Sequence, residues 1–207
     1  MTSSAQSTQK TQSTPPLRRV VVVHGYNAYP TAHWFPWLGE QLAAQGIEMV
    51  AVELPTPATP VAEEWEHAVA AALGVPDETT WVVTHSLGGI TALRVLAALP
   101  PGWRLGGLVL VSGFTGRLPN LPVLDDFLAD DVDAEALVGS IGVRQMIRSD
   151  DDTNVPPASS DRLAQRLDAG VHVQEGAGHF LAAEGITSLP LLTRLLAESG
   201  ALADRPA

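Results

Sequence analysis

The chain has 207 residues, of which 45% are hydrophobic, so it can bury one hydrophobic core but is short for two domains of ordinary size. Its net charge of −11 argues against a surface for nucleic acid or anionic membranes, because phosphate groups are repelled by such a field. No cysteine is present, which excludes disulfides, thiol catalysis and a cysteine-based metal site.

The first sixteen residues are rich in Ser, Thr and Gln and end at Pro15-Pro16. They contain no apolar stretch of the kind found in a secretion signal. We therefore predict a disordered N-terminal tail over residues 1–16, followed by one folded domain over 17–203. The longest apolar runs are far shorter than a membrane span, so a soluble, cytoplasmic protein is expected.

Apolar runs typical of strands alternate with helical patterns along the rest of the chain. The predicted strands are 18–25, 47–55, 80–86, 105–113, 143–149 and 171–176. The predicted helices are 33–46, 61–74, 87–100, 133–141, 159–170 and 189–200. This alternation predicts a single α/β domain with about six mainly parallel strands and helices on both faces of the sheet. Residues 114–131 form the one insertion large enough for a small cap, so no large lid is expected.

Chemically active side chains follow several of the predicted strands. His24 to Asn27 follow the first, Ser86 the third, Asp150 to Asp152 the fifth, and His179 the sixth. Ligands of open α/β sheets bind at the carboxyl ends of the strands, so these residues are expected to meet there. The chain order serine, acid, histidine is the order of the α/β-hydrolases and differs from that of the other common triads.

Ser86 is the candidate nucleophile. The motif of a nucleophile elbow is G-x-S-x-G, and this chain has Thr84 where the first glycine would stand. Gly88 and Gly89 supply the small residues on the helix side that a sharp strand-to-helix turn requires. The alternative is that Ser86 is simply the N-cap of a helix, a position that favours serine.

His179, in a glycine-flanked loop, is the candidate general base. Asp152 is the preferred acid to orient it and Asp151 the second choice, while at least two of the three adjacent carboxylates are expected to be merely solvated. Of the remaining histidines, His33, His67, His85 and His172 are expected to have structural roles. For His24, in the loop after the first strand, a structural hydrogen bond is the first expectation and substrate binding the second.

The oxyanion hole is predicted to consist of the backbone N–H groups of Leu87 and Tyr26, with the Asn27 amide as a rival to Tyr26. His24, Asn27 and Phe114 are the candidate substrate-binding residues, and core packing is the alternative for Phe114. Acidic residues gather between positions 125 and 135, either as a solvated loop or as a surface that disfavours anionic substrates. No metal or organic cofactor is needed for this chemistry.

Four segments, HGYNAYPTAHWFPWL, THSLGG, DDDTNVP and GAGHF, resemble the small α/β-hydrolases typified by retinoblastoma-binding protein nine and the bacterial YdeN-like serine hydrolases. The resemblance spans roughly residues 18–200. It implies a compact serine hydrolase without a large lid, and its motifs place the nucleophile at Ser86, the acid at Asp152 and the histidine at His179. Thr84 departs from the general hydrolase elbow, but members of this family tolerate a residue other than glycine there.

The expected function is a serine hydrolase that cleaves carboxylic esters of small to medium substrates through an acyl-enzyme. An amidase or aminopeptidase on the same triad is one alternative, and a non-enzymatic protein-binding module on a hydrolase fold is another. A small-molecule ester or amide is the expected partner. The residues do not indicate a protein partner or an oligomeric state.

Overall fold

The computed structural model describes residues 15–202 and contains one six-stranded sheet. The strand order is β2-β1-β3-β4-β5-β6, and every neighbouring pair is parallel. The strands are β1 (Arg19–Val23), β2 (Glu48–Ala51), β3 (Thr80–His85), β4 (Leu105–Val111), β5 (Ile141–Ser149) and β6 (Gly170–Gln174). The predicted single-domain α/β fold is therefore confirmed.

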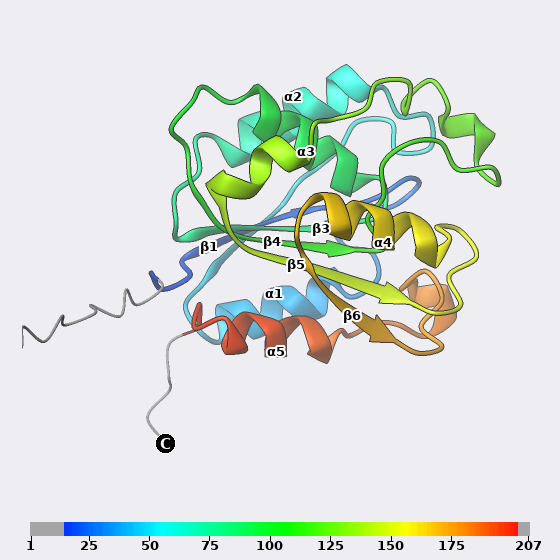
Figure 1. The fold of residues 1–207 in the computed structure, drawn as a ribbon. Coiled ribbons are helices and arrows are strands. Elements are labelled where there is room, and N and C mark those ends of the chain that lie inside the picture. Colours follow the sequence, from blue (N-terminus) through cyan, green and yellow to red (C-terminus); the bar gives the residue numbers. More distant parts are fainter. Residues whose placement is uncertain (1–14, 203–207) are drawn as a thin grey trace, which may run out of the picture.

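Helices cover both faces of the sheet, as Figure 1 shows. One face carries α1 (Phe35–Ala43) and α5 (Pro190–Glu198), and the other carries α2 (Ala62–Leu73), α3 (Gly88–Ala98) and α4 (Pro157–Arg166). The central strands β3 and β4 are buried along their whole length because both of their faces are covered. This double burial explains why the sequence of β4, LGGLVLV, is a continuous apolar run instead of an alternating pattern.

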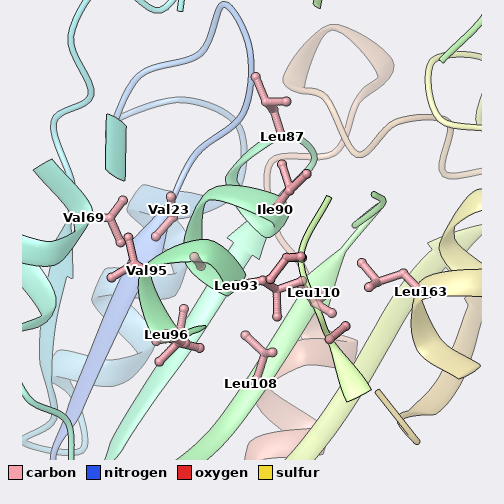
Figure 2. Packing of buried hydrophobic residues seen from close by; sticks show 14 of the residues in the cluster. Val23, Val69, Leu87, Ile90, Leu93, Val95, Leu96, Leu108, Leu110 and Leu163 are labelled. Carbon is pink, nitrogen blue, oxygen red and sulfur yellow. The ribbon is translucent and has the colours of Figure 1, made fainter. Parts of the chain in front are cut away.

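The helix α3 packs against the middle of the sheet and follows directly after Ser86. Its side chains Ile90, Leu93 and Leu96 lie over Leu108 and Leu110 of β4 in the larger apolar cluster (Figure 2). Each of these side chains is at least 99% buried, and a fully buried leucine stabilises a fold by about 1.5–3 kcal/mol. The start of α3 is thus fixed on the sheet, which fixes the position of Ser86.

The segment after β4 folds down onto α2 and α3 and forms no large lid. It contains the short 3₁₀ helices η1 (Pro122–Leu124) and η2 (Glu135–Ser140), and its side chains Leu124 and Phe127 are buried in the core. The guanidinium of Arg94 donates to the carbonyl of Phe127 at 3.0 Å, and that of Arg166 donates to the carbonyl of Val132 at 2.6 Å. Two helices therefore hold this segment through arginine side chains.

The structure corrects the predicted helix at 133–141. Residues 135–140 form the 3₁₀ helix η2, and Ile141 already begins β5, where it lies beside Leu105 of β4. Residues 1–14 of the predicted tail at 1–16 lie outside the described residues, so the tail stays a prediction. The domain prediction of 17–203 ends one residue beyond the described range and stays a prediction. Within residues 15–202, no helix has the length and apolar character needed to cross a membrane.

Candidate active site

Ser86 lies on a sharp turn between β3 and α3. Its φ of 53° is in the left-handed region, which costs a residue with a side chain about 1–3 kcal/mol. The helix begins at Gly88, its N-cap is Leu87, and no side chain caps it. Ser86 is therefore not the N-cap that its sequence position also allowed, and the backbone has the shape of a nucleophile elbow.

Backbone strain is concentrated at the edge of the sheet where Ser86 lies. Among residues 15–202, seven residues other than glycine have a positive φ, and six of them lie in the loops that follow strands: Asn27, His33, Thr56, Ser86, Ser112 and Phe180. Asp168 is the remaining one. Strained conformations persist where the surrounding structure imposes them, and they are enriched at functional sites.

Gly88 permits the close approach of strand β1 to the helix that follows Ser86. A Cβ atom at this position would lie 2.4 Å from the carbonyl oxygen of Val23 and 2.5 Å from that of His24. Both contacts are with backbone, which cannot move aside as a flexible side chain would. The elbow therefore depends on glycine here. Thr84, at the first glycine position of the motif, is completely buried, and its hydroxyl oxygen has no hydrogen-bond partner within the described residues.

We expect Gly88→Ala to lower the free energy of unfolding by about 2–4 kcal/mol, because the backbone around Ser86 must shift to relieve the contacts. Gly139→Ala is the matched control, since a Cβ there meets nothing within 4 Å. Urea unfolding of both variants measures the difference. A Gly88→Ala midpoint equal to that of the control would contradict this account of the elbow.

The loop after β1 lies directly beside Ser86. A Cβ on Gly25 would be 2.8 Å from the Ser86 Cβ and 3.4 Å from its Oγ, so only a residue without a side chain fits. Within the described part of the chain, no protein acceptor receives the backbone N–H of Tyr26 or of Leu87. The Asn27 N–H instead donates to the carbonyl of Pro57 at 2.8 Å. These bonds favour Tyr26 over Asn27 as an oxyanion donor.

Asp152 and His179 form a buried pair. The Nδ1–H of His179 donates to Oδ2 of Asp152 at 2.8 Å, and the Ser112 hydroxyl donates to the same oxygen at 2.8 Å. The other carboxylate oxygen accepts the N–H groups of Asn154 and Val155, each at 2.9 Å. Four donors thus satisfy a carboxylate that is only 6% exposed, which fixes its orientation towards the imidazole ring.

Asp150 and Asp151 also hold the loop that carries His179. Asp150 accepts the N–H of Gly176 at 2.8 Å, and Asp151 accepts the N–H of Gly178 at 2.8 Å. Hydrogen bonds to Asp151, first from the Ser149 hydroxyl and then from Gly178, lower the pKa of its carboxyl group. Asp150 and Asp151 are exposed to solvent, as expected of two of the three aspartates, but each also binds a backbone N–H of this loop.

Three further histidines lie around this site. Burial lowers the pKa of His85 well below its ordinary value of 6.5, and the nearby His179 lowers it further. Burial followed by the proximity of His179 lowers the pKa of His33, and burial lowers that of His24. These side chains are consequently neutral at pH 7, so they add no positive charge beside His179.

The depressed pKa of His85 makes stability depend on pH. Below about pH 6.5 the unfolded chain takes up a proton at His85 that the folded protein does not, so the free energy of unfolding falls as the pH decreases from there towards the folded pKa. The slope is at most about 1.4 kcal/mol per pH unit for one histidine. Denaturant unfolding between pH 7.5 and 5 should show a shallower decline for His85→Phe than for the wild type. Equal slopes would contradict the buried, neutral state of His85.

The predicted substrate-binding residues lie in different surroundings. Asn27 is exposed at the sheet edge, whereas His24 is buried and its Nδ1–H donates to the carbonyl of Gly25 at 2.9 Å. Phe114 is completely buried in the larger apolar cluster and contributes packing. A role for these residues in binding substrate stays a prediction. Within residues 15–202, no group of three or more His, Asp or Glu side chains is placed so that it could hold a metal ion.

The sequence could have pointed to Ser112, which was not among the predicted site residues. It directly follows β4 and therefore lies at the same sheet edge as the other candidates. Glu184 was missed as well. Its carboxylate accepts the N–H groups of His179 at 2.8 Å and Leu181 at 3.0 Å. No sequence motif signals Glu184, because its role depends on the conformation of the loop.

Comparison with known proteins agrees with the fold. Residues 20–198 match the family described as serine hydrolase. The YdeN protein of Bacillus subtilis (strain 168) is 40% identical over 179 residues, covering 86% of this chain and 94% of the relative. The crystal structure of the ydeN gene product from B. subtilis superimposes with a TM-score of 0.84 at 39% identity, covering 88% of this chain and 98% of that one.

More distant structures share the fold. A YdeN-like protein of Pectobacterium atrosepticum has a TM-score of 0.70 at 20% identity, covering 89% of this chain and 91% of its own. A structure from work on carboxylesterases of the thaumarchaeon Nitrososphaera gargenis has a TM-score of 0.69 at 11% identity, covering 88% and 91%. The chain is a hydrolase that belongs to the serine hydrolase family, as its YdeN-like motifs predicted.

Proposed function

We propose that the protein hydrolyses carboxylic esters through an acyl-enzyme formed on Ser86. The observation that carries this proposal is the buried pair of Asp152 and His179, joined by a 2.8 Å hydrogen bond at the sheet edge where Ser86 occupies its strained turn. Serine, histidine and aspartate with these roles are the parts of a hydrolytic triad. Their exposed fractions of 7%, 7% and 6% mean that water reaches them only slightly, which strengthens the electrostatic interactions between them.

In the proposed mechanism, the Ser86 oxygen attacks the ester carbonyl carbon while its proton passes to Nε2 of His179. Asp152 accepts the Nδ1–H and stabilises the imidazolium ion. The N–H groups of Leu87 and Tyr26 stabilise the developing oxyanion. The tetrahedral intermediate expels the alcohol, which takes the proton from His179. Water then repeats these steps to release the acid and regenerate Ser86.

The charges around the site affect which substrate charge the protein would accept. The loops that follow the strands are residues 24–34, 52–61, 86–87, 112–134, 150–156 and 175–189. They contain eleven of the 23 acidic residues and one of the 12 basic residues of the chain. That base, Arg117, is paired with Asp125 at 3.6 Å. Such a field repels anions, so we propose neutral esters with short or medium acyl groups as the substrates.

The experiment is a panel of p-nitrophenyl esters from acetate to octanoate, together with a p-nitrophenyl ester that carries a free carboxylate and a set of aminoacyl p-nitroanilides. We expect the highest kcat/KM for neutral esters and a lower value for the anionic ester that rises with salt, because salt screens the repulsion. Faster cleavage of the anilides would replace the esterase proposal with the amidase alternative. A folded protein that turns over neither class would favour a binding role.

A cytoplasmic location, expected from the sequence, is likewise a proposal. Cell fractionation of the producing organism, with an antibody against the full chain, tests it directly.

A further inference from the structure

His85 connects the strand that presents Ser86 to the loop that presents His179. It is the last residue of β3, and only 2% of its surface is exposed. Its Nε2–H donates to the backbone carbonyl of His179 at 2.8 Å, and a carbonyl can only accept, so the proton must lie on Nε2. The centroids of the two imidazole rings are 4.8 Å apart.

Packing alone does not explain a histidine at this position. The other ring nitrogen, Nδ1, is buried without a hydrogen-bond partner, and an unsatisfied buried polar atom costs about 1–3 kcal/mol. The rings of Trp34 and Phe35 meet His85 edge-to-face at centroid distances of 6.4 Å and 6.3 Å, an environment that would also suit phenylalanine. What histidine adds here is the bond to the carbonyl of His179.

Other contacts hold the turn that follows His179 but do not reach this carbonyl. Glu184 accepts backbone N–H groups of the turn, and Nδ1 of His33 accepts the N–H of Ala182 at 3.1 Å. The centroid of the His33 ring lies 5.4 Å from that of His85. The side chain of His179 is anchored by Asp152, and its own carbonyl is anchored by His85. The imidazole is thereby held from two sides.

We infer that His85 is a positioning residue, which fixes the backbone of His179 so that the imidazole ring is directed at Ser86. This inference rests on the function proposed above. Because reacting groups must be aligned closely, a small displacement of the general base is expected to slow the chemical step more than it weakens substrate binding. The loss should therefore appear in kcat and leave KM largely unchanged.

The test compares His85→Phe, His85→Gln and His172→Phe on the best ester of the panel. His85→Phe keeps a ring but cannot donate, and we expect kcat to fall about 10- to 100-fold. Glutamine carries a side-chain N–H₂ group, so His85→Gln should recover part of that loss. His172 is the matched control, since its Nε2 bonds to the Gln145 side chain at 2.8 Å, between β6 and β5, and its ring is not hydrogen-bonded to Ser86, Asp152 or His179. His172→Phe should retain the wild-type kcat.

Two measurements keep the test independent of folding and of substrate choice. Thermal unfolding establishes that each variant is folded, and two-bond ¹H–¹⁵N spectra of the histidine rings should show His85 protonated at Nε2 in the wild type. A folded His85→Phe variant with wild-type kcat, equal losses in the Phe and Gln variants, or a proton on Nδ1 would overturn the inference. If the wild type and His172→Phe also fail to hydrolyse esters, the proposed function itself fails, and the inference with it.

Discussion

Ser86→Ala is expected to lower kcat/KM for ester hydrolysis by at least about 10³-fold, because the oxygen that would form the acyl-enzyme is removed. The substitution should leave the fold intact. Alanine is smaller than serine, and the Ser86 Oγ takes part in no hydrogen bond that caps the following helix. The measurement is steady-state hydrolysis of a p-nitrophenyl ester with enzyme purified to exclude a contaminating esterase.

Ser160→Ala provides the matched control for this substitution. Ser160 is also buried, but it lies on α4 and not at the strand ends. Its alanine variant should hydrolyse the ester at the wild-type rate. A Ser86→Ala protein that keeps more than about a tenth of the wild-type activity would contradict the role of Ser86, since the residual activity of such variants comes only from binding and the oxyanion hole.

Asp152→Asn is expected to reduce kcat by about 10³- to 10⁴-fold. The asparagine amide is neutral, so it cannot stabilise the imidazolium form of His179. In the wild type, Oδ2 of Asp152 accepts two hydrogen bonds, from the His179 ring N–H and from the Ser112 hydroxyl. An asparagine NH₂ group at the position of Oδ2 would face both of these donors. The kcat of the purified variant, compared with that of the wild type under saturating ester, measures the effect.

The neighbouring aspartates offer controls within the same turn. Asp151 and Asp150 bind backbone N–H groups of the His179 loop and not the imidazole ring. We expect Asp151→Asn and Asp150→Asn to reduce kcat by about tenfold or less, because they loosen the loop while the Asp152 carboxylate, which contacts the ring, keeps its charge. A loss for Asp151→Asn as large as that for Asp152→Asn would overturn the assignment of the acid.

The order of strands and helices could be predicted from the sequence because the central strands are buried on both faces. Residues 105–111, for example, are continuously apolar and are followed by a polar turn that begins at Ser112. The structure of the short segment at 133–141 was not predicted correctly. Its pattern resembles a helix, but the pairing of Ile141 with Leu105 extends β5 at its N-terminal end and leaves only a 3₁₀ turn before it.

The candidate site residues could be predicted from their positions after the strands, but their hydrogen-bond partners could not. The three consecutive aspartates have identical side chains, so the sequence does not distinguish them. Only the path of the loop at 176–179 gives each carboxylate a different hydrogen-bond donor. His85 was expected to pack, and it does. Its bond to a residue 94 positions away depends on tertiary structure that no local pattern encodes.

Covalent labelling tests whether Ser86 is the activated nucleophile. The full-length protein is incubated with a fluorophosphonate, its intact mass is measured, and the modified residue is located by tandem mass spectrometry. We predict one adduct per chain, located on Ser86, that forms far more slowly in Asp152→Asn. A folded wild-type protein that gains no adduct, or gains it on another residue, would show that Ser86 is not the activated nucleophile.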